Sequence, residues 1–398
     1  MRKLDFGINI WYNINMEQNY TYNYRLYPTI EQSVLLEKHF GCSRFVYNYY
    51  LNKEQQHYLN NKEDIEAKRI KGHLNYYDNA NSLTKLKQEK EWLKEVNSQM
   101  LQATLKHLES AYRSFFQKRA KFPRFKSKKE RQSFCVPQHL KIQDNKLYIP
   151  KFKEGIKIRL YREVVGKFVT ATLVKTKANK YFINITVKKD ISPLKKNKRD
   201  IGIDLGIKNF AITSNGEIFD NKHFLKKVEP KLKYLQRQAS KKVKDSNNRK
   251  KAILKVAELF EYINNCKKDY LHKTSIQLIR ENQTIYVEDL NVKGMLQNHH
   301  LAKSIQELSW YEFIRMLEYK AKWYDRNLIK IDRFYPSSKT CNKCGYIKQD
   351  LTLRDRNWIC PRCGEEIDRD YNAAKNILER GRNCLAKPTE LSGSKQKQ

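Results

Sequence analysis

Four of the eight cysteines form two close pairs near the end of the chain. Cys341 and Cys344 enclose two residues, Cys360 and Cys363 enclose two more, and fifteen residues separate the pairs. Two such pairs can supply four thiolates to one tetrahedral Zn²⁺ ion, and a glycine follows each pair to relieve the backbone. Four protein ligands leave no open position, so we expect a structural site that stabilises a segment of about thirty residues. An iron–sulfur cluster is the alternative for four thiolates.

The charge of the chain points to a polyanionic partner. The 398 residues include 80 Lys and Arg against 43 Asp and Glu, a net charge of +37. Such an excess strains a compact state by self-repulsion unless a polyanion such as nucleic acid neutralises it. An acidic membrane is a weaker alternative, because no run of 18 apolar residues is present and the N-terminus lacks a secretory signal. We therefore expect a cytoplasmic protein without a membrane partner or disulfides.

Hydrophobic periodicity divides the chain into several parts. Residues 22–27 alternate as a short strand, and Thr29 is typical of a helix cap at the start of a helical region that reaches about Gln117. From Leu140 to Lys188 the period is two, with Val169, Ala171 and Leu173 on one face, which predicts an antiparallel sheet or small barrel. Beyond a linker at 190–199, buried strands at 201–204, 285–287 and 328–331 alternate with helices, which indicates an α/β domain. We expect the N-terminal 20 residues to be a flexible extension, with Met16 an alternative start.

Two basic stretches are candidate nucleic-acid contacts. Eight of the fourteen residues from Lys118 to Arg131 are basic, with two phenylalanines among them, and residues 225–255 hold 12 basic residues against two acidic ones on two predicted helices. Cations beside flat rings suit a nucleic-acid backbone and its bases, although a solvated linker or helix face is the alternative for each stretch. The candidate contacts are Lys118, Arg119, Lys121, Arg124, Lys126, Arg249, Lys250 and Lys251.

Three carboxylates lie at positions that favour metal binding. Asp204 and Glu288 each end a strand that is predicted to be buried, where an unpaired charge is costly and a divalent ion would offset that cost. Asp370 begins a predicted helix that contains Ala373, Ala374 and Ile377, so an ordinary helix cap is its alternative role.

Several motifs, in one order, resemble TnpB, the accessory protein of bacterial insertion sequences that is related to compact type V CRISPR effectors. They are Ile203-Asp204-Leu205-Gly206-Ile207-Lys208, Val287-Glu288-Asp289-Leu290-Asn291, Tyr335-Pro336-Ser337-Ser338-Lys339-Thr340-Cys341 and Asp368-Arg369-Asp370-Tyr371-Asn372-Ala373-Ala374. The likeness covers about residues 22–384. One departure is Ile367, where relatives often have His.

The resemblance implies a multidomain α/β protein with a β-barrel. It implies a wedge barrel at 21–34 and 126–190, a helical recognition lobe at 35–125, an RNase H-like RuvC nuclease domain at 199–335 and 367–384, an inserted zinc ribbon at 336–366 and a disordered tail at 385–398. Asp204, Glu288 and Asp370 match the family's catalytic carboxylates. Three such groups can hold two Mg²⁺ ions about 4 Å apart for phosphodiester hydrolysis. Asp289 and Asp368, their acidic neighbours, are expected to be structural or to support the metal ligands.

The resemblance also implies an RNA-guided DNA endonuclease of a transposable element. Such a protein binds a guide RNA derived from the end of the element and cuts double-stranded DNA beside a short target-adjacent motif, with base pairing reading the sequence. We expect a monomer or dimer with one RNA. The alternatives are a strand-transferring transposase, a non-cutting RNA-guided DNA-binding regulator and a compact CRISPR effector.

Overall fold

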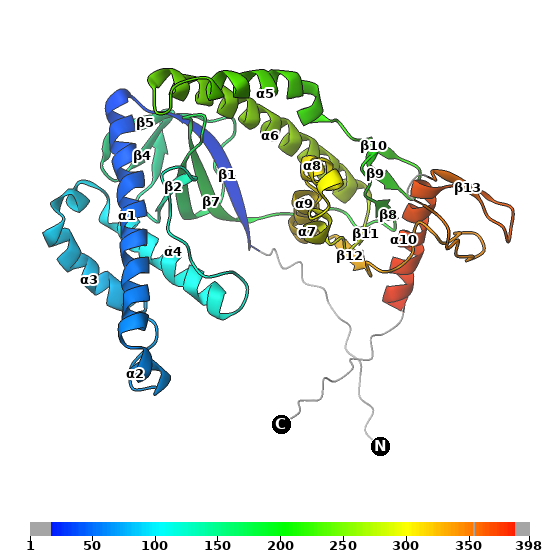
Figure 1. Cartoon of the computed structure of the whole chain (residues 1–398), viewed down its shortest axis with the longest axis horizontal. Helices are drawn as coiled ribbons and strands as arrows, with labels where there is room; N and C mark the ends of the chain where they lie inside the picture. The colour runs from blue at the N-terminus through cyan, green and yellow to red at the C-terminus, as the bar shows by residue number, and fades with distance from the viewer. Residues whose placement is uncertain (1–16, 353–354, 387–398) are drawn as a thin grey trace. The chain divides into compact units, whose positions relative to one another are not determined.

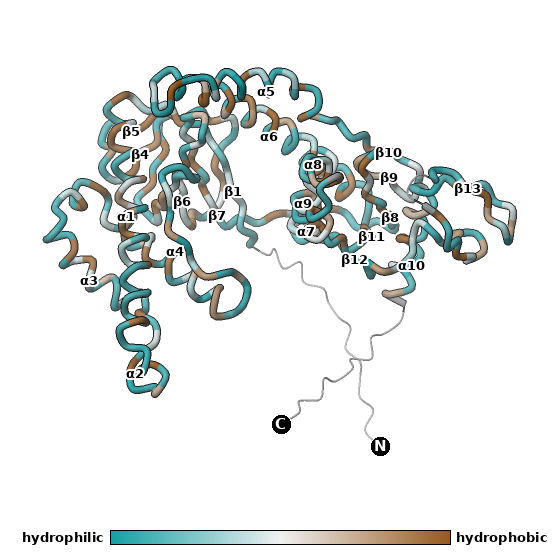
Figure 2. Tube along the Cα trace, in the orientation of Figure 1, coloured by the Kyte–Doolittle hydropathy of each residue, from teal (hydrophilic) through white to brown (hydrophobic). Residues whose placement is uncertain are grey.

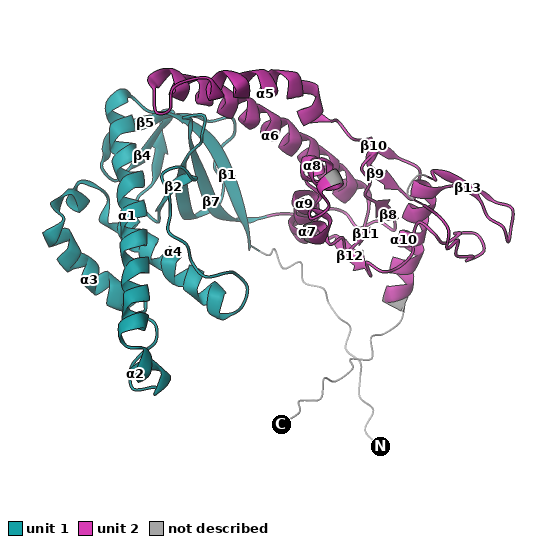
Figure 3. Ribbon diagram, viewed as in Figure 1, with its two compact units in different colours: residues 1–190 teal, residues 191–398 magenta. Residues whose placement is uncertain are grey.

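The computed structural model describes residues 17–352 and 355–386, and these form two compact units (Figure 3). Residues up to Asp190 belong to unit 1, and residues from Ile191 onward belong to unit 2. The expected extension at 1–16 and the tail from 387 lie outside the described residues. Within the described ranges, no helix combines the length and the apolar character needed to cross a bilayer.

Unit 1 is built on an antiparallel sheet (Figure 1). The sheet has seven strands in the order β2-β6-β7-β1-β5-β4-β3. Its strands are β1 (Glu17–Tyr27), β2 (Gln132–Val136), β3 (Lys141–Gln143), β4 (Lys146–Ile149), β5 (Phe152–Arg159), β6 (Lys167–Lys175) and β7 (Tyr181–Asp190). The order leaves β2 and β3 as edges among the described strands, so the expected barrel is an open sheet here. A turn between β6 and β7 contains Asn179, which has a φ of +52°.

The helices of unit 1 pack against this sheet through one buried core. They are α1 (Ile30–Asn60), α2 (Lys62–Glu66), α3 (Tyr76–Glu89), the 3₁₀ turn η1 (Glu91–Glu95) and α4 (Ser98–Phe116). Phe40 of α1 and Leu101 of α4 share a buried cluster with Tyr24 of β1. The expected cap at Thr29 is confirmed, because its hydroxyl accepts from the backbone N–H of Gln32 at 3.2 Å.

Three sequence expectations need correction in unit 1. Strand β1 begins at Glu17, because residues 17–20 pair with β7, so they belong to the sheet and not to the extension. Helix α1 begins at Ile30, as the cap at Thr29 predicts, so residues 30–34 belong to the helices and not to the barrel that the resemblance implies. Val169 is 41% exposed although Ala171 and Leu173 are buried, because the register shifts between Phe168 and Thr170 and a bulge of this kind interrupts the period of two.

Unit 2 contains a five-stranded mixed sheet in the order β10-β9-β8-β11-β12. Its strands are β8 (Asp200–Asp204), β9 (Asn209–Thr213), β10 (Ile218–Asp220), β11 (Thr284–Glu288) and β12 (Asn327–Ile331). Strand β9 runs antiparallel to its neighbours β8 and β10, whereas β11 runs parallel to both β8 and β12. The strands predicted at 201–204, 285–287 and 328–331 are confirmed.

The helices of unit 2 are α5 (Phe224–Ser240), α6 (Asn247–Glu281), α7 (Val292–Met295), α8 (His299–Leu308), α9 (Trp310–Tyr324) and α10 (Arg369–Ala386). Helices α9 and α10 lie on opposite faces of the sheet, whereas α5 packs mainly against α6. Ile203 and Val287 share a buried cluster with Phe313 of α9 on one face. The alternate residue Tyr286 clusters with Ile377 of α10 on the other face. The two long basic helices predicted at 225–255 are α5 and the start of α6, and the trace of α5 is mostly hydrophilic (Figure 2).

A small two-stranded ribbon precedes α10. It consists of β13 (Asn357–Ile359) and β14 (Glu366–Asp368), which pair antiparallel around the buried side chains of Leu351, Trp358 and Ile367. The ribbon expected at 336–366 therefore extends two residues further, to Asp368, because the buried side chain of Ile367 completes its core.

Helix α10 approaches β8 so closely that only glycine fits between them. A Cβ atom on Gly202 would lie 2.2 Å from the carbonyl oxygen of Ala374 and 2.7 Å from the backbone nitrogen of Leu378. A Cβ atom on Gly381 would lie 2.0 Å from the ring of Tyr286 on β11. The two glycines thus fix the separation between α10 and the sheet.

We expect Gly202→Ala to lower the free energy of unfolding by on the order of 1–3 kcal/mol, because α10 must move outward. Gly41→Ala in α1 is the control, since a Cβ atom there meets nothing within 4 Å; it should instead add about 0.5–1 kcal/mol through helix propensity. Thermal unfolding of both variants measures the difference. A Gly202→Ala chain as stable as the parent would contradict the close approach.

Candidate active site and metal centre

Asp204 and Glu288 lie side by side at one edge of the unit 2 sheet. Asp204 ends β8 and Glu288 ends β11, and these strands are parallel neighbours in which Ile203 pairs with Val287. The carboxyl ends of parallel strands meet at the same sheet edge, so both acidic groups emerge there. Asp370 comes from the first turn of α10, which packs across β8.

Electrostatics connects the three carboxylates. Burial and then the charges of Glu288 and Asp370 raise the pKa of Asp204 to about 8. Asp204 makes no ion pair or side-chain hydrogen bond within the part of the chain that the structure describes. Burial also raises the pKa of Glu288, against the opposing effect of a hydrogen bond from the Ser337 hydroxyl to Glu288 Oε1 at 2.5 Å.

Two arginines that the sequence prediction did not include hold Asp370. Arg369 donates to Asp370 Oδ1 from Nε at 3.0 Å and from Nη2 at 2.8 Å, and Arg356 Nη1 donates to Oδ2 at 3.2 Å. Arg369 also donates to the backbone carbonyl of Asp355 at 3.2 Å, which fixes its guanidinium. For Arg369, the only signal in the sequence was its position beside Asp370. Arg356 directly precedes strand β13, and no signal in the sequence pointed to its contact with Asp370.

The acidic neighbours have structural roles. Asp368 accepts from the backbone N–H of Tyr371 at 2.8 Å, so it caps α10, and Asp370 is free of that role. Asp289 forms an ion pair with Arg333. The expectation that Asp289 and Asp368 are structural agrees with these contacts.

The three carboxylates form a less compact group than the four cysteines. In residues 17–352 and 355–386, only the four cysteines bring three or more ligand atoms within 4.8 Å of one another. Glu288 and Asp370 are near enough to raise the pKa of Asp204, but the three carboxylates do not bring their oxygens within 4.8 Å of one another. Hard oxygen ligands of this kind suit Mg²⁺, which binds through a few carboxylates, waters and phosphates.

The four cysteines predicted to bind zinc come together. Cys341 Sγ lies 3.7 Å from Cys363 Sγ, and Cys344 Sγ lies 3.5 Å from Cys360 Sγ. A tetrahedral ion with metal–sulfur distances near 2.3 Å places its sulfurs about 3.8 Å apart, so this donor set fits one metal ion. The glycine after each pair has a positive φ, +75° at Gly345 and +71° at Gly364, as a tight knuckle requires.

Buried asparagines connect the cysteine centre to α10. Asn372 Oδ1 accepts from the backbone N–H of Asn342 at 2.9 Å, within the first cysteine pair. Asn376, 1% exposed, donates to the carbonyl of Ser337 at 2.7 Å and to that of Thr340 at 2.6 Å. The thiolate centre is therefore tied to the helix that carries Asp370 and to the segment that contacts Glu288.

The basic residues predicted near position 120 lie in an irregular segment of unit 1. Lys118, Arg119, Lys121 and Arg124 are exposed, and Phe122 and Phe125 expose 41% and 50% of their surface. Lys126 differs, because its Nζ lies 3.8 Å from the ring centroid of Tyr47 and its backbone N–H donates to Asn48 at 2.7 Å. Lys126 thus holds the segment to α1, whereas the other four cations face solvent.

The second predicted basic group lies in unit 2, in the first turn of α6. Ser246 caps this helix by accepting from the backbone N–H of Arg249 at 3.1 Å. Lys250 and Lys251 are exposed, and Arg249 donates to the carbonyl of Lys242 at 3.2 Å. Three cations at the positive end of a helix dipole favour an anion.

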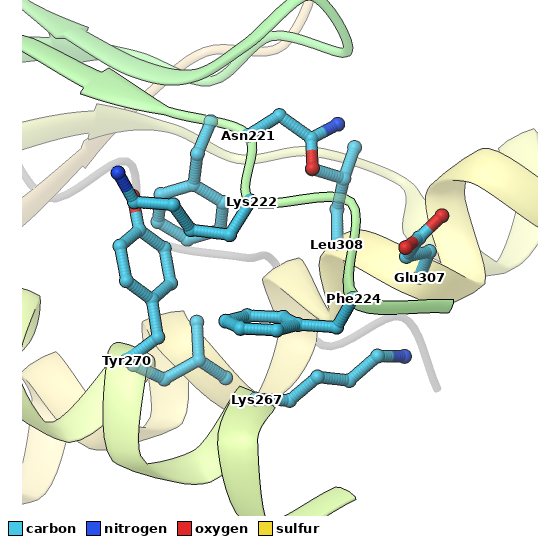
Figure 4. Close-up of a pocket in the computed structure, with 9 residues that line it drawn as sticks. Asn221, Lys222, Phe224, Lys267, Tyr270, Glu307 and Leu308 are labelled. Atoms are coloured by element: carbon cyan, nitrogen blue, oxygen red, sulfur yellow. The ribbon is translucent and has the colours of Figure 1, made fainter. Parts of the chain in front are cut away.

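A separate small cavity lies where α5 begins (Figure 4). It measures about 20 Å³, which is room for about one water molecule. The rings of Phe224 and Tyr270 line it in an edge-to-face arrangement, with centroids 6.1 Å apart. Glu307 accepts a hydrogen bond from the backbone N–H of Leu225 at 2.8 Å. None of the three carboxylates lines it. The cavity is a packing feature that joins α5 to α6 and α8.

Three family profiles match successive parts of the chain. They are described as "Helix-turn-helix domain" at residues 16–63, "Probable transposase" of the OrfB_IS605 type at 182–299 and "Cas12f1-like, TNB domain" at 310–377.

A relative from Streptomyces pristinaespiralis, named "Putative RNA-guided DNA endonuclease", is 38% identical over 90% of this chain and 89% of its own length. The chain belongs to the TnpB family. Another member, "Putative RNA-guided DNA endonuclease InsQ" of Escherichia coli K12, is 31% identical over 93% of this chain and 94% of its own length.

The fold of this TnpB protein is similar to that of a chain in the solved structure "Cryo-EM structure of the Cas12f1-sgRNA-target DNA complex". The TM-score is 0.54 at 15% identity, over 88% of this chain and 83% of the other. The mixed α/β class expected from the sequence is confirmed. The N-terminal profile's name does not describe this TnpB chain, because residues 17–60 form strand β1 followed by the single helix α1.

The raised pKa of Asp204 predicts a pH-dependent stability. The unfolded chain releases this proton near pH 4, whereas the folded chain keeps it to about pH 8 in the absence of magnesium. Between these values the folded state binds more protons, so the contribution of Asp204 to the free energy of unfolding falls as pH rises. Asp204→Asn removes this penalty. Its melting temperature in magnesium-free buffer should exceed that of the parent by several degrees at about pH 8 and by little at about pH 5. A difference that does not change with pH would contradict the raised pKa, and with it the burial of Asp204 beside Glu288 and Asp370.

Proposed function

We propose that this chain is an RNA-guided DNA endonuclease of a transposable element, with its cleavage site at Asp204, Glu288 and Asp370. The observation that carries the proposal is geometric: the parallel neighbours β8 and β11 end at Asp204 and Glu288, and α10, whose first turn carries Asp370, packs against β8. The names of the relatives from Streptomyces pristinaespiralis and Escherichia coli K12 support the activity. The strand order β10-β9-β8-β11-β12 supports an RNase H-like domain of the RuvC type.

The proposed reaction is phosphodiester hydrolysis with two Mg²⁺ ions. Ions bound there would activate a water molecule and stabilise the leaving oxygen. Asp204, Glu288 and Asp370 would together hold these ions, since Glu288 and Asp370 both lie close enough to raise the pKa of Asp204. Ser337 orients Glu288, and Arg369 orients Asp370, each through the hydrogen bonds described above. No side-chain nucleophile is needed.

The proposed partners are a guide RNA and double-stranded DNA. The exposed cations at 118–124 and at the start of α6 would contact phosphates, and the exposed rings of Phe122 and Phe125 would contact bases. Base pairing between guide and target would read the sequence, so these residues need contact only the backbone and its shape.

Substitution of each carboxylate tests the cleavage site. We expect Asp204→Ala, Glu288→Ala and Asp370→Ala each to lower DNA cleavage by more than about a hundredfold and to retain the copurifying RNA, because a lost metal ligand costs more than a lost supporting contact. Asp200→Ala is the matched control, since Asp200 lies at the opposite end of β8 and pairs with Arg382; it should cut normally.

Plasmid cleavage measured by gel electrophoresis also separates the alternatives. Linear product without joined strands is expected, whereas joined strands would favour a transposase. Undiminished cutting by all three variants would refute the assignment.

The second proposal is that Cys341, Cys344, Cys360 and Cys363 hold one structural zinc ion. We expect elemental analysis to give one zinc per chain, and Cys360→Ser to lose the metal and to lower the melting temperature, because four thiolates stabilise the ribbon that holds α10. Cys266→Ser, in α6, is the control and should retain zinc. Iron in place of zinc, or a folded parent chain without metal, would overturn this proposal.

A further inference from the structure

Phe334 is unusually exposed for an aromatic residue. It exposes 86% of its surface, more than any other large hydrophobic residue that the structure describes. It lies three residues after the end of β12, in the loop 332–337. An isolated exposed hydrophobic residue is ordinary, so the position and the rigidity of this one decide whether it has a role.

The loop that carries Phe334 is held from both sides by the strand end that carries Glu288. Before Phe334, Arg333 forms an ion pair with Asp289. After it, the buried Ser337 donates its hydroxyl to Glu288 Oε1 at 2.5 Å. Within the loop, the backbone N–H of Phe334 donates to Asp332 Oδ1 at 2.7 Å. The ring is therefore exposed on a fixed backbone.

The same contacts place Phe334 beside the proposed cleavage site. Ile331 pairs with Glu288 in the parallel register of β11 and β12, and three residues span at most about 10 Å. Phe334 and Arg333 line an open hollow together with Asp289. A phosphodiester at the three carboxylates would therefore bring a neighbouring base within reach of the ring.

We propose that Phe334 is a stacking platform for one nucleobase of the single DNA strand that enters the cleavage site. The inference rests on the proposed endonuclease function and adds a binding residue to it. Nucleobases of every kind present a flat face to an aromatic ring, so such a platform holds a strand without reading its sequence. The strand's phosphates suit a chain of net charge +37 better than a second copy of that chain does. In this role Phe334 positions the strand and takes no part in the chemistry.

Fluorescence of a base analogue tests the platform without cleavage. The sample is the full chain with its copurifying RNA in an Asp204→Ala background. The probe is a single-stranded DNA oligonucleotide with one 2-aminopurine, whose fluorescence falls when it stacks, placed at each position in turn. We expect quenching at one or two adjacent positions. Adding Phe334→Leu should abolish that quenching and weaken binding of the strand by about tenfold, because an aliphatic side chain has no π face. Phe334→Trp should preserve both.

Quenching that survives in the Phe334→Leu chain would overturn the proposal. So would conversion of a dimer to a monomer by Phe334→Leu with the quenching unchanged, which would assign the ring to self-association. An unchanged melting temperature is expected for both variants because the ring is exposed, and it excludes misfolding as the cause. Failure of the endonuclease function is read separately, as the absence of DNA cleavage by the parent chain, so the two failures are distinguishable.

Discussion

The close approach of α10 to the unit 2 sheet is the constraint on which the proposed active site depends. The sheet itself brings two carboxylates together, because β8 and β11 are parallel neighbours that end at Asp204 and Glu288. The third carboxylate, Asp370, comes from another element, helix α10. Gly202 lets the backbone of α10 contact β8 directly, with no side chain between them, and this contact sets the distance of Asp370 from the strand ends. A spacing fixed by backbone contact is more precise than one fixed by flexible side chains.

That convergence has an electrostatic cost, which the fold offsets unevenly. Asp370 forms ion pairs with Arg369 and Arg356. Asp204 instead has a raised pKa, because burial and two neighbouring negative charges oppose its ionisation. Divalent ions would remove the remaining repulsion. The ribbon contributes at a distance, since Arg356 belongs to it and Asn372 and Asn376 join its first cysteine pair and the preceding segment to α10. One metal centre would thus stabilise the framework of another.

Local patterns in the sequence predicted much of this arrangement. Cysteine spacing identified the thiolate centre, and apolar strands that end in an acid identified Asp204 and Glu288, because both signals depend on a few neighbouring residues. The resemblance supplied the proposed role of Asp370 as a metal ligand, for which spacing alone left a helix cap open; the structure assigns that cap to Asp368. Features that depend on pairing between distant segments were missed. They include the start of β1 at Glu17, the bulge that exposes Val169, and the contacts of Arg356 and Ser337 with the carboxylates.

The central claim is that Asp204, Glu288 and Asp370 share a pair of divalent ions. The most direct measurement is anomalous X-ray scattering from crystals of the chain with nucleic acid and Mn²⁺ in place of Mg²⁺. Two manganese peaks about 4 Å apart are expected, held by Asp204, Glu288 and Asp370. Well-ordered density for the three carboxylates without manganese between them, or manganese bound only elsewhere on the chain, would contradict it.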